Sequence, residues 1–189
     1  MKLLEQRILT SGKVLPGGIL KIDSFLNHQM DPMLMMEMAK ELKKLYEGAG
    51  VNKILTIEAS GIAIAIMAGY EFGCPVVFAK KSKTKNISDN VYSVEVESFT
   101  HGKTNTVVVS KEFINPGDKI LIVDDFLATG AALIGLKALV EQAGAEVIGA
   151  GIAVEKVFQG GGNLLREQGM RVESLAMIAS MDDTSLTFC

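Results

Sequence analysis

ILIVDDFLATGAA, residues 120–132, is the stretch that decides the fold. An apolar run that ends in Asp124 and Asp125 predicts a buried strand, and the small residues after it predict a tight loop that enters a helix. Open α/β sheets bind their ligands at the carboxyl ends of strands. The start of a helix offers free N–H groups and the positive end of its dipole to an anion. The stretch therefore predicts a phosphate site between a strand and a helix.

The residues after the acids suit this chemistry. Ala128, Gly130, Ala131 and Ala132 are small enough to let a phosphate approach the backbone, and Thr129 adds a hydroxyl donor. The two acids beside the loop suit ribose hydroxyls, or a Mg²⁺ ion held through oxygen or water. The same residues could instead be an acidic strand end followed by a threonine helix cap.

Short apolar runs alternate with helical segments on both sides of this stretch. The predicted strands are 53–59, 75–81, 120–126, 145–156 and 171–178, and the predicted helices are 2–10, 32–48, 62–73, 128–144 and 160–169. Such alternation predicts an α/β fold with an open, mostly parallel sheet flanked by helices. The runs are continuously apolar because helices would cover both faces of the sheet.

Two segments depart from the alternation. Residues 14–30 are punctuated by glycine and proline, and we expect an irregular structure there. Residues 82–112 contain the alternating run VYSVEVESF and a second β-rich run, TNTVVVS, which together predict a polar hairpin. A long insertion in a compact domain is often a mobile lid. The alternative is an ordinary surface hairpin.

Composition limits the function classes. A length of 189 residues predicts a single domain, 1–189. The chain has 19 Lys and Arg against 22 Asp and Glu, so a basic nucleic-acid-binding domain is not expected. Cys74 and Cys189 form no disulfide framework. The N-terminus lacks the apolar core of a signal peptide, and no apolar stretch is long enough for a membrane span. We expect a cytoplasmic protein with reduced thiols and no membrane or nucleic-acid partner.

Other residues could complete a ligand site. A second strand-to-helix turn with small residues could hold a second anion, or could be a normal tight turn; its residues are Glu58, Ala59, Ser60 and Gly61. Lys156 follows a strand and could donate to a carbonyl oxygen of a ligand, or could be a solvated surface lysine. Lys81 belongs to a basic run that could meet phosphates or simply face solvent. Complete Walker, dinucleotide and G-x-S-x-G motifs are missing, which disfavours dehydrogenases and hydrolases.

ILIVDDFLATGAA resembles the phosphoribosyl diphosphate (PRPP) motif of type I phosphoribosyltransferases, which has four apolar residues, two acids and small residues around Thr-Gly. Ala131 and Ala132 replace the usual ending, so the backbone donors remain and one hydroxyl is lost. EASGIA resembles the pyrophosphate loop of the family. The resemblance implies a hood over the base at about 1–50, a core at 51–189 and a flexible lid at 82–112.

The order of segments along nearly the whole chain is similar to that of bacterial members that act on xanthine. VLPGGILKIDSFLNHQMDP and GIAVEKVFQGG carry this closer likeness. The resemblance implies transfer of the phosphoribosyl group from PRPP to xanthine in purine salvage, with Mg²⁺ bound mainly through PRPP, by a homodimer. The alternatives are an enzyme for guanine, hypoxanthine or adenine, and a non-catalytic regulator that senses PRPP or a purine on the same fold.

The resemblance also implies a role for each site residue. Asp124 and Asp125 would face the ribose hydroxyls and support the metal site. The 5′-phosphate would bind Ala128, Thr129, Gly130, Ala131 and Ala132, and the pyrophosphate would bind Glu58, Ala59, Ser60, Gly61 and Lys81. The base would bind Leu20, Asn27 and Lys156, with the Asn27 amide directed to the 2-oxo group that separates xanthine from hypoxanthine.

Overall fold

A computed structural model describes residues 1–81, 90–98 and 103–189. Its helices are α1 (Lys2–Ser11), α2 (Pro32–Leu45), α3 (Gly61–Phe72), α4 (Ala131–Gln142) and α5 (Gly161–Glu167), with a π-helical turn η1 (Asp23–Asn27) and a 3₁₀ turn η2 (Val157–Gln159). Its strands are β1 (Lys13–Leu15), β2 (Ile19–Lys21), β3 (Lys53–Ile57), β4 (Val76–Ala79), β5 (Val91–Ser98), β6 (Lys103–Ser110), β7 (Lys119–Leu127), β8 (Glu146–Lys156), β9 (Val172–Met181) and β10 (Leu186–Phe188). No helix in these ranges is long and apolar enough to cross a membrane.

The central sheet has the order β10-β9-β8-β7-β3-β4. Every neighbouring pair is parallel except β10 with β9, so the predicted open, mostly parallel sheet is confirmed. The antiparallel edge strand β10 was not predicted. It forms after a turn in which the Asp182 carboxylate accepts from the backbone N–H groups of Thr184 and Ser185. Because β3, β7 and β8 are adjacent and parallel, their carboxyl ends meet at one edge of the sheet.

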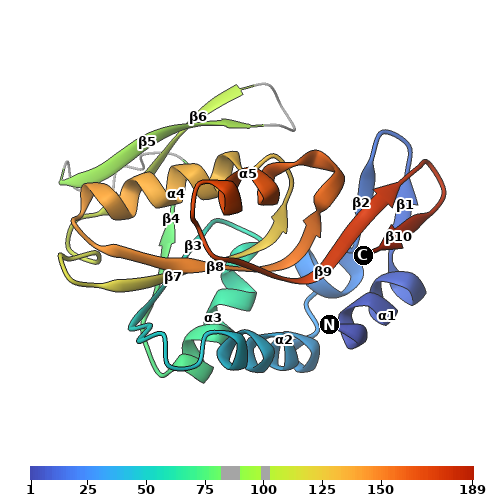
Figure 1. Cartoon of the computed structure of the whole chain (residues 1–189), viewed down its shortest axis with the longest axis horizontal. Coiled ribbons are helices and arrows are strands. Elements are labelled where there is room, and N and C mark those ends of the chain that lie inside the picture. The colour runs from blue at the N-terminus through green and yellow to red at the C-terminus, as the bar shows by residue number, and fades with distance from the viewer. Residues whose placement is uncertain (82–89, 99–102) are drawn as a thin grey trace.

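Helices cover both faces of the sheet (Figure 1): α4 and α5 lie on one face, and α2 and α3 on the other. Each face buries its own apolar cluster, one built around Leu42 and Ile64 and the other around Leu136 and Leu139. The predicted cap of α2 is confirmed, since the Asp31 carboxylate accepts from two backbone N–H groups of the first turn at 3.1 Å. These two cores hold the strand ends, and the turns after them, in fixed positions.

The hood is more regular than expected. Residues 14–30 were predicted to be irregular, but β1 and β2 pair as a short antiparallel hairpin and η1 follows it. The buried side chains of Phe25 and Leu26 anchor η1 in the core. Figure 1 shows the hairpin and α1 gathered beside β9 and β10. The N-terminal segment therefore packs as an ordered unit beside β9 and β10, and its role as a hood over the base stays a prediction.

The predicted hairpin within 82–112 is present as β5 and β6, which pair antiparallel over eight residues each. It lies over α4 (Figure 1), and a Cβ atom on Gly135 would overlap the Val96 side chain. Backbone hydrogen bonds of 2.9 Å join Lys80 and Val108, so the hairpin is tied to the sheet beyond β4. Residues 82–89 and 99–102 of the predicted lid lie outside the described residues, and its mobility stays a prediction.

Candidate active site

The turn between β7 and α4 has the strand, short loop and helix that the sequence predicts at this position. β7 ends at Leu127 and α4 begins at Ala131, so the loop proper is 128–130 and the small residues after it form the first helical turn. The N–H of Ile134 donates to the carbonyl of Gly130 at 3.0 Å, which closes that turn. The first N–H groups of a helix have no acceptor inside the helix. The turn therefore presents backbone donors and the positive end of the α4 dipole to an anion.

The two acids near the end of β7 are buried. Asp124 is 5% exposed and Asp125 is 7% exposed. Burial raises the pKa of the Asp124 carboxyl well above its ordinary value, and the charge of Asp125 raises it further, while the Lys81 ammonium lowers it. The backbone N–H of Asp125 donates to Asp124 Oδ1 at 3.0 Å. A cation or hydroxyl donor on a bound ligand would stabilise the ionised form of these two carboxylates.

The turn between β3 and α3 packs directly against the Asp124 carboxylate. A Cβ atom on Gly61 would overlap the Thr56 hydroxyl and would lie 2.7 Å from Asp124 Oδ1, so only glycine fits there. Glu58 sits at the start of the turn, and its Oε1 accepts from the backbone N–H of Lys81 at 2.7 Å. The structure therefore brings together the two turns that the sequence suggested as a pair of anion loops.

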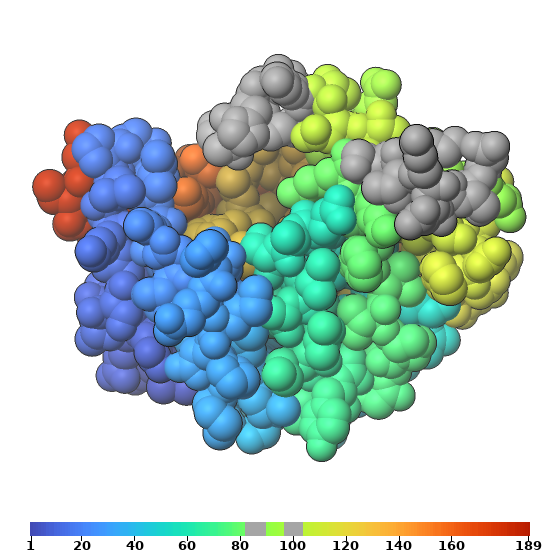
Figure 2. Space-filling view, turned by 180° about the vertical axis from the view of Figure 1, so that it is seen from behind, coloured from blue at the N-terminus to red at the C-terminus, as the bar shows by residue number. Residues whose placement is uncertain are grey.

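A cavity of about 200 Å³ lies between these turns. Its walls come from both turns and from the hairpin, and the lining residues are Ile57, Glu58, Ser60, Lys81, Val96, Asn105, Val107, Asp124, Asp125, Phe126, Leu127, Ala128, Thr129, Gly130, Ala131, Ala132 and Leu133. Figure 2 shows a hollow between the blue N-terminal segment and the yellow-green hairpin, with gold and orange residues at its floor. Asn105 was not predicted as a site residue from the sequence. Its polar amide within the second β-rich run was the available signal.

Lys156, at the end of β8, connects the core to the hood. Its Nζ donates to the carbonyl of Gly18 at 2.8 Å and lies 5.6 Å from the centroid of the Phe126 ring. Burial lowers the pKa of the Lys156 ammonium. Phe126 lines the cavity between the turns, but Lys156 itself is not one of the lining residues. The position of the amine beside the Phe126 ring suits a donor to the carbonyl oxygen of a planar ligand.

The other two predicted base contacts lie in the hood. Leu20 is 7% exposed, belongs to the apolar core and pairs with Val14 in the β1–β2 hairpin. Asn27 ends η1 and is half-buried. Neither residue lines the cavity between the two turns. Lys156 is joined to the hood through Gly18, and like Leu20 and Asn27 it is not among the residues that line the cavity.

The acidic pair fits a divalent cation. Two buried carboxylates that repel each other supply the oxygen ligands that Mg²⁺ prefers. Among the described residues, no group of three or more His, Cys, Asp or Glu side chains could hold a metal ion alone. Asp124 and Asp125 could therefore support an ion whose remaining ligands come from a bound substrate.

The open sheet of this order, with an acid pair before a turn of small residues, has the fold of a type I phosphoribosyltransferase. The sequence profile of the phosphoribosyl transferase domain matches residues 22–161. The chain belongs to this family, with the type I fold.

Two curated relatives extend this assignment. The xanthine phosphoribosyltransferase of Bacillus cereus strain AH187 is 54% identical over 188 residues, which cover 100% of this chain and 95% of that protein. The xanthine phosphoribosyltransferase of Bacillus anthracis has the same identity and coverage.

Solved structures support the fold alone. Adenine phosphoribosyltransferase from Giardia lamblia, in complex with 9-deazaadenine, has a TM-score of 0.77 at 22% identity and covers 92% of this chain and 97% of its own. The enzyme from Thermoanaerobacter pseudethanolicus has a TM-score of 0.74 at 24% identity, covering 92% of this chain and 99% of its own.

Proposed function

We propose that the chain transfers the 5-phosphoribosyl group of PRPP to xanthine, giving xanthosine 5′-monophosphate and pyrophosphate, in purine salvage. The observation that carries this proposal is the likeness to xanthine phosphoribosyltransferases at 54% identity across the whole chain. The cavity supports it, because two buried acids and a phosphate turn line the same space. A substrate with phosphate at one end and pyrophosphate at the other matches the two turns.

Each wall of the site has a role in this reaction. The turn at 128–132 binds the 5′-phosphate through backbone donors and the Thr129 hydroxyl. Asp124 and Asp125 accept from the ribose hydroxyls. The turn at 58–61, with Lys81, holds the pyrophosphate. Mg²⁺, when bound to the substrate, neutralises charge on the leaving group.

Positioning and charge neutralisation dominate such a reaction. Breaking the bond from C1 to pyrophosphate leaves a cation-like ribose centre, which the acids stabilise from one side. The hairpin covers the cavity with Val96 and Val107, so it limits access of water to the activated ribose. The lid prediction extends this role, since closure would exclude water during transfer.

The base pocket favours an oxopurine. Lys156 is half-buried and reaches across to the hood, so its amine can leave Gly18 and donate to a purine oxygen. Adenine carries an amino donor at position 6, and a cationic amine would reject it. Asn27 offers its amide to the 2-oxo group, and Leu20 contributes its backbone.

Assembly and location complete the proposal. The resemblance to the family implies a homodimer, and the exposed side chains of Ile66 and Tyr70 on α3, at 53% and 75%, are available to an interface. Cys74 and Cys189 are both free thiols, as expected in the reducing cytoplasm.

A turnover assay tests the proposal. Purified protein with Mg²⁺ and PRPP receives xanthine, guanine, hypoxanthine or adenine separately. We expect kcat/KM for xanthine to exceed that for adenine by at least about 10³-fold, since a polar pocket strongly rejects a base with the wrong donors. Preference for another base would refute the xanthine assignment. Absence of turnover with all four bases, together with PRPP binding by calorimetry, would favour the alternative of a non-catalytic regulator that senses PRPP or a purine.

The same assay on Lys156→Ala locates the base. Turnover of oxopurines should fall while PRPP affinity measured without base stays unchanged. Lys40→Ala is the matched control, because Lys40 pairs with Glu37 on the exposed face of α2. An equal loss of PRPP affinity in Lys156→Ala would move this lysine out of the base pocket.

A further inference from the structure

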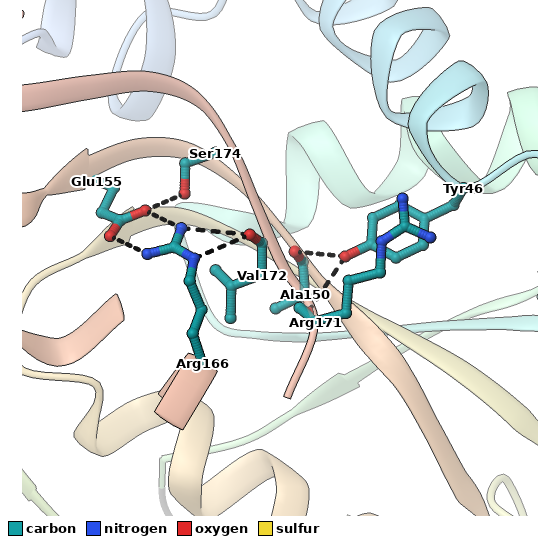
Figure 3. A network of polar contacts seen from close by, with 7 residues as sticks. All are labelled: Tyr46, Ala150, Glu155, Arg166, Arg171, Val172 and Ser174. Carbon is teal, nitrogen blue, oxygen red and sulfur yellow. Dashed lines mark hydrogen bonds and ion pairs between the residues drawn. The ribbon is translucent and has the colours of Figure 1, made fainter. Parts of the chain in front are cut away.

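The carboxylate of Glu155 has no part in the proposed chemistry, yet it is fully buried beside Lys156. Two guanidinium nitrogens of Arg166 donate to it: Nη1 to Oε1 at 2.8 Å and Nη2 to Oε2 at 2.7 Å. The Ser174 hydroxyl also donates to Oε2 (Figure 3). Burial acts to raise the pKa of the Glu155 carboxyl, but the hydrogen bonds from Arg166 and Ser174 outweigh it and hold that pKa below its usual value.

Arg166 ties the short helix α5 to two strands. Besides binding Glu155 on β8, its Nε and Nη2 donate to the carbonyl of Val172 on β9 at 3.3 and 3.2 Å. α5 has only seven residues and begins with consecutive glycines. A helix this short is not stable alone, and glycines add conformational freedom at its start. The guanidinium is therefore a polar tether of α5, which the fully buried Leu165 side chain also anchors in the apolar core.

The start of α5 lies against the phosphate loop. The N–H of Gly161 donates to the carbonyl of Ala128 at 3.1 Å, and a Cβ atom on Gly161 would overlap that carbonyl. A Cβ atom on Gly162 would overlap Glu155 Oε1 and would lie 2.8 Å from Arg166 Nη1. One continuous set of contacts thus joins the buried ion pair to the loop, with no room between its members.

We propose that Glu155 and Arg166 are positioning residues for the phosphate loop: the pair fixes α5, and α5 holds Ala128 and Gly130 in the arrangement that binds the 5′-phosphate of PRPP. This role rests on the proposed function. A buried ion pair is not by itself a strong source of stability compared with apolar residues of similar size. The two parallel hydrogen bonds of the pair instead give geometric specificity, which a loop that must match a phosphate requires.

Arg171, directly before β9, provides a matched control because its side chain contacts the end of α2 instead of α5. Its Nε donates to Glu173 at 2.9 Å, and its Nη2 donates to the carbonyl of Leu45 at 2.6 Å. Its guanidinium lies 4.4 Å from the centroid of the Tyr46 ring, and Figure 3 shows the two side chains together. Arg171 therefore also joins an ion pair to a backbone carbonyl. Its partners are Leu45 at the end of α2, Tyr46 directly after it, and Glu173 on β9. The partners of Arg166, by contrast, belong to the set of contacts that reaches the phosphate loop.

The experiment compares Arg166→Lys with Arg171→Lys. Lysine keeps the charge and loses the paired hydrogen bonds. Steady-state kinetics give the PRPP KM at saturating xanthine and the xanthine KM at saturating PRPP, and calorimetry gives PRPP affinity with Mg²⁺ and no base. We expect Arg166→Lys to raise the PRPP KM and Kd about tenfold and to change the xanthine KM less than about twofold, as expected for a displaced binding loop. Arg171→Lys should change neither KM, even where its Tm falls as much.

A second variant keeps the test decisive if the lysine variant does not fold. Glu155→Gln combined with Arg166→Met removes both charges, so no uncompensated charge is left buried. It should raise the PRPP KM at least as much as Arg166→Lys does. An unchanged PRPP KM in either folded variant, or an equal rise of both KM values, would overturn the positioning role.

The experiments distinguish a failure of the proposed function from a failure of the positioning role of Arg166. A wild-type enzyme that uses guanine instead of xanthine would refute the xanthine assignment, while the PRPP readouts would still decide the role of Arg166. A wild-type protein with no affinity for PRPP would overturn both proposals.

Discussion

The neighbouring strands β7 and β8 both end in buried carboxylates, and the two ends treat this charge in opposite ways. At the end of β7, Asp124 and Asp125 repel each other, and burial raises the pKa of Asp124. At the end of β8, Glu155 receives three hydrogen bonds from Arg166 and Ser174, which hold its pKa down. The strands are in register, with Asp124 opposite Ile152 and Leu127 opposite Glu155. Two neighbouring strands therefore carry buried acids near their ends: those of β7 repel each other, and the one of β8 is paired with Arg166.

The difference distinguishes acids that are available to bind a ligand from an acid that holds neighbouring elements of the protein in place. A charge without partners is destabilising in the free protein, and it is retained where a ligand supplies the missing partner. A charge with all partners inside the protein is available to hold neighbouring elements in place. In the proposed reaction the acids of β7 meet the ribose, and in the proposed positioning role Glu155 of β8 holds α5 against the loop at 128–130. Substitutions at the two ends should have different consequences.

The largest effect is expected for Asp124→Asn combined with Asp125→Asn. Both acids contact the ribose in the proposed reaction, so kcat/KM should fall by about 10⁴-fold, or about 5 kcal/mol of activation free energy. The fold should remain, because the amides have the shape of the acids. Turnover kinetics and circular dichroism check the two statements, and full activity in a folded double variant would refute the role of the pair.

A smaller effect of unusual sign is expected for the stability of Asp124→Asn alone. The amide removes repulsion with Asp125 and can still accept from the Asp125 N–H. The ligand-free variant should be about 1–3 kcal/mol more stable than wild type at pH 7, the range for a buried group without compensation. The folded pKa of Asp124 lies above its ordinary 3.8, so wild type loses stability as the pH rises above about 4. The gain should therefore disappear below that pH.

Glu155→Gln is the control of opposite sign in the same urea-unfolding series. It leaves the Arg166 guanidinium without its counter-charge, and we expect a loss of about 2–3 kcal/mol at pH 7, moderated because the Arg166 side chain is 32% exposed. The folded pKa of Glu155 is lowered, so this contribution exists above its unfolded pKa and is lost as the pH falls through the folded pKa. If both variants shift stability in the same direction, the two strand ends do not differ as described.

The turn at the end of β7 was predictable because its signal is local. The apolar run, the acid pair and the small residues after it are consecutive in sequence, and both strand-to-helix turns lie where this pattern places them. The fold class followed from the same alternation and is confirmed. The roles of the individual site residues, including the base contacts Leu20 and Asn27, stay predictions.

The end of β8 was not predictable in the same way. Glu155, Arg166 and Ser174 lie on three elements, and no spacing in the sequence links them. The burial of Glu155 depends on the packing of α5, which is a tertiary effect. β10 and the hood hairpin were missed because strands of three residues give too little periodicity to detect. Asn105 enters the cavity only because the hairpin folds over α4.

The smallest effect is expected for a substitution of Thr129, in the loop between β7 and α4. Thr129 lines the cavity, and Thr129→Ala deletes one donor to the 5′-phosphate. PRPP affinity should fall about tenfold, corresponding to about 1.4 kcal/mol for a hydrogen bond to a charged group, and the xanthine KM should stay constant. Thr129→Ser keeps the hydroxyl and should retain wild-type affinity. An unchanged Kd for PRPP in the alanine variant would remove this donor from the site.

Combining Thr129→Ala with Arg166→Lys makes the comparison sharper. If Arg166 acts by placing the loop, a displaced loop already weakens the contact of the Thr129 hydroxyl with phosphate. Thr129→Ala should then cost less affinity in the Arg166→Lys background than in wild type, and the two changes should not be additive. The same cycle with Arg171→Lys should be additive, because Arg171 contacts α2 instead of α5. Additivity in both cycles would mean that the charge at the end of β8 does not reach the phosphate loop.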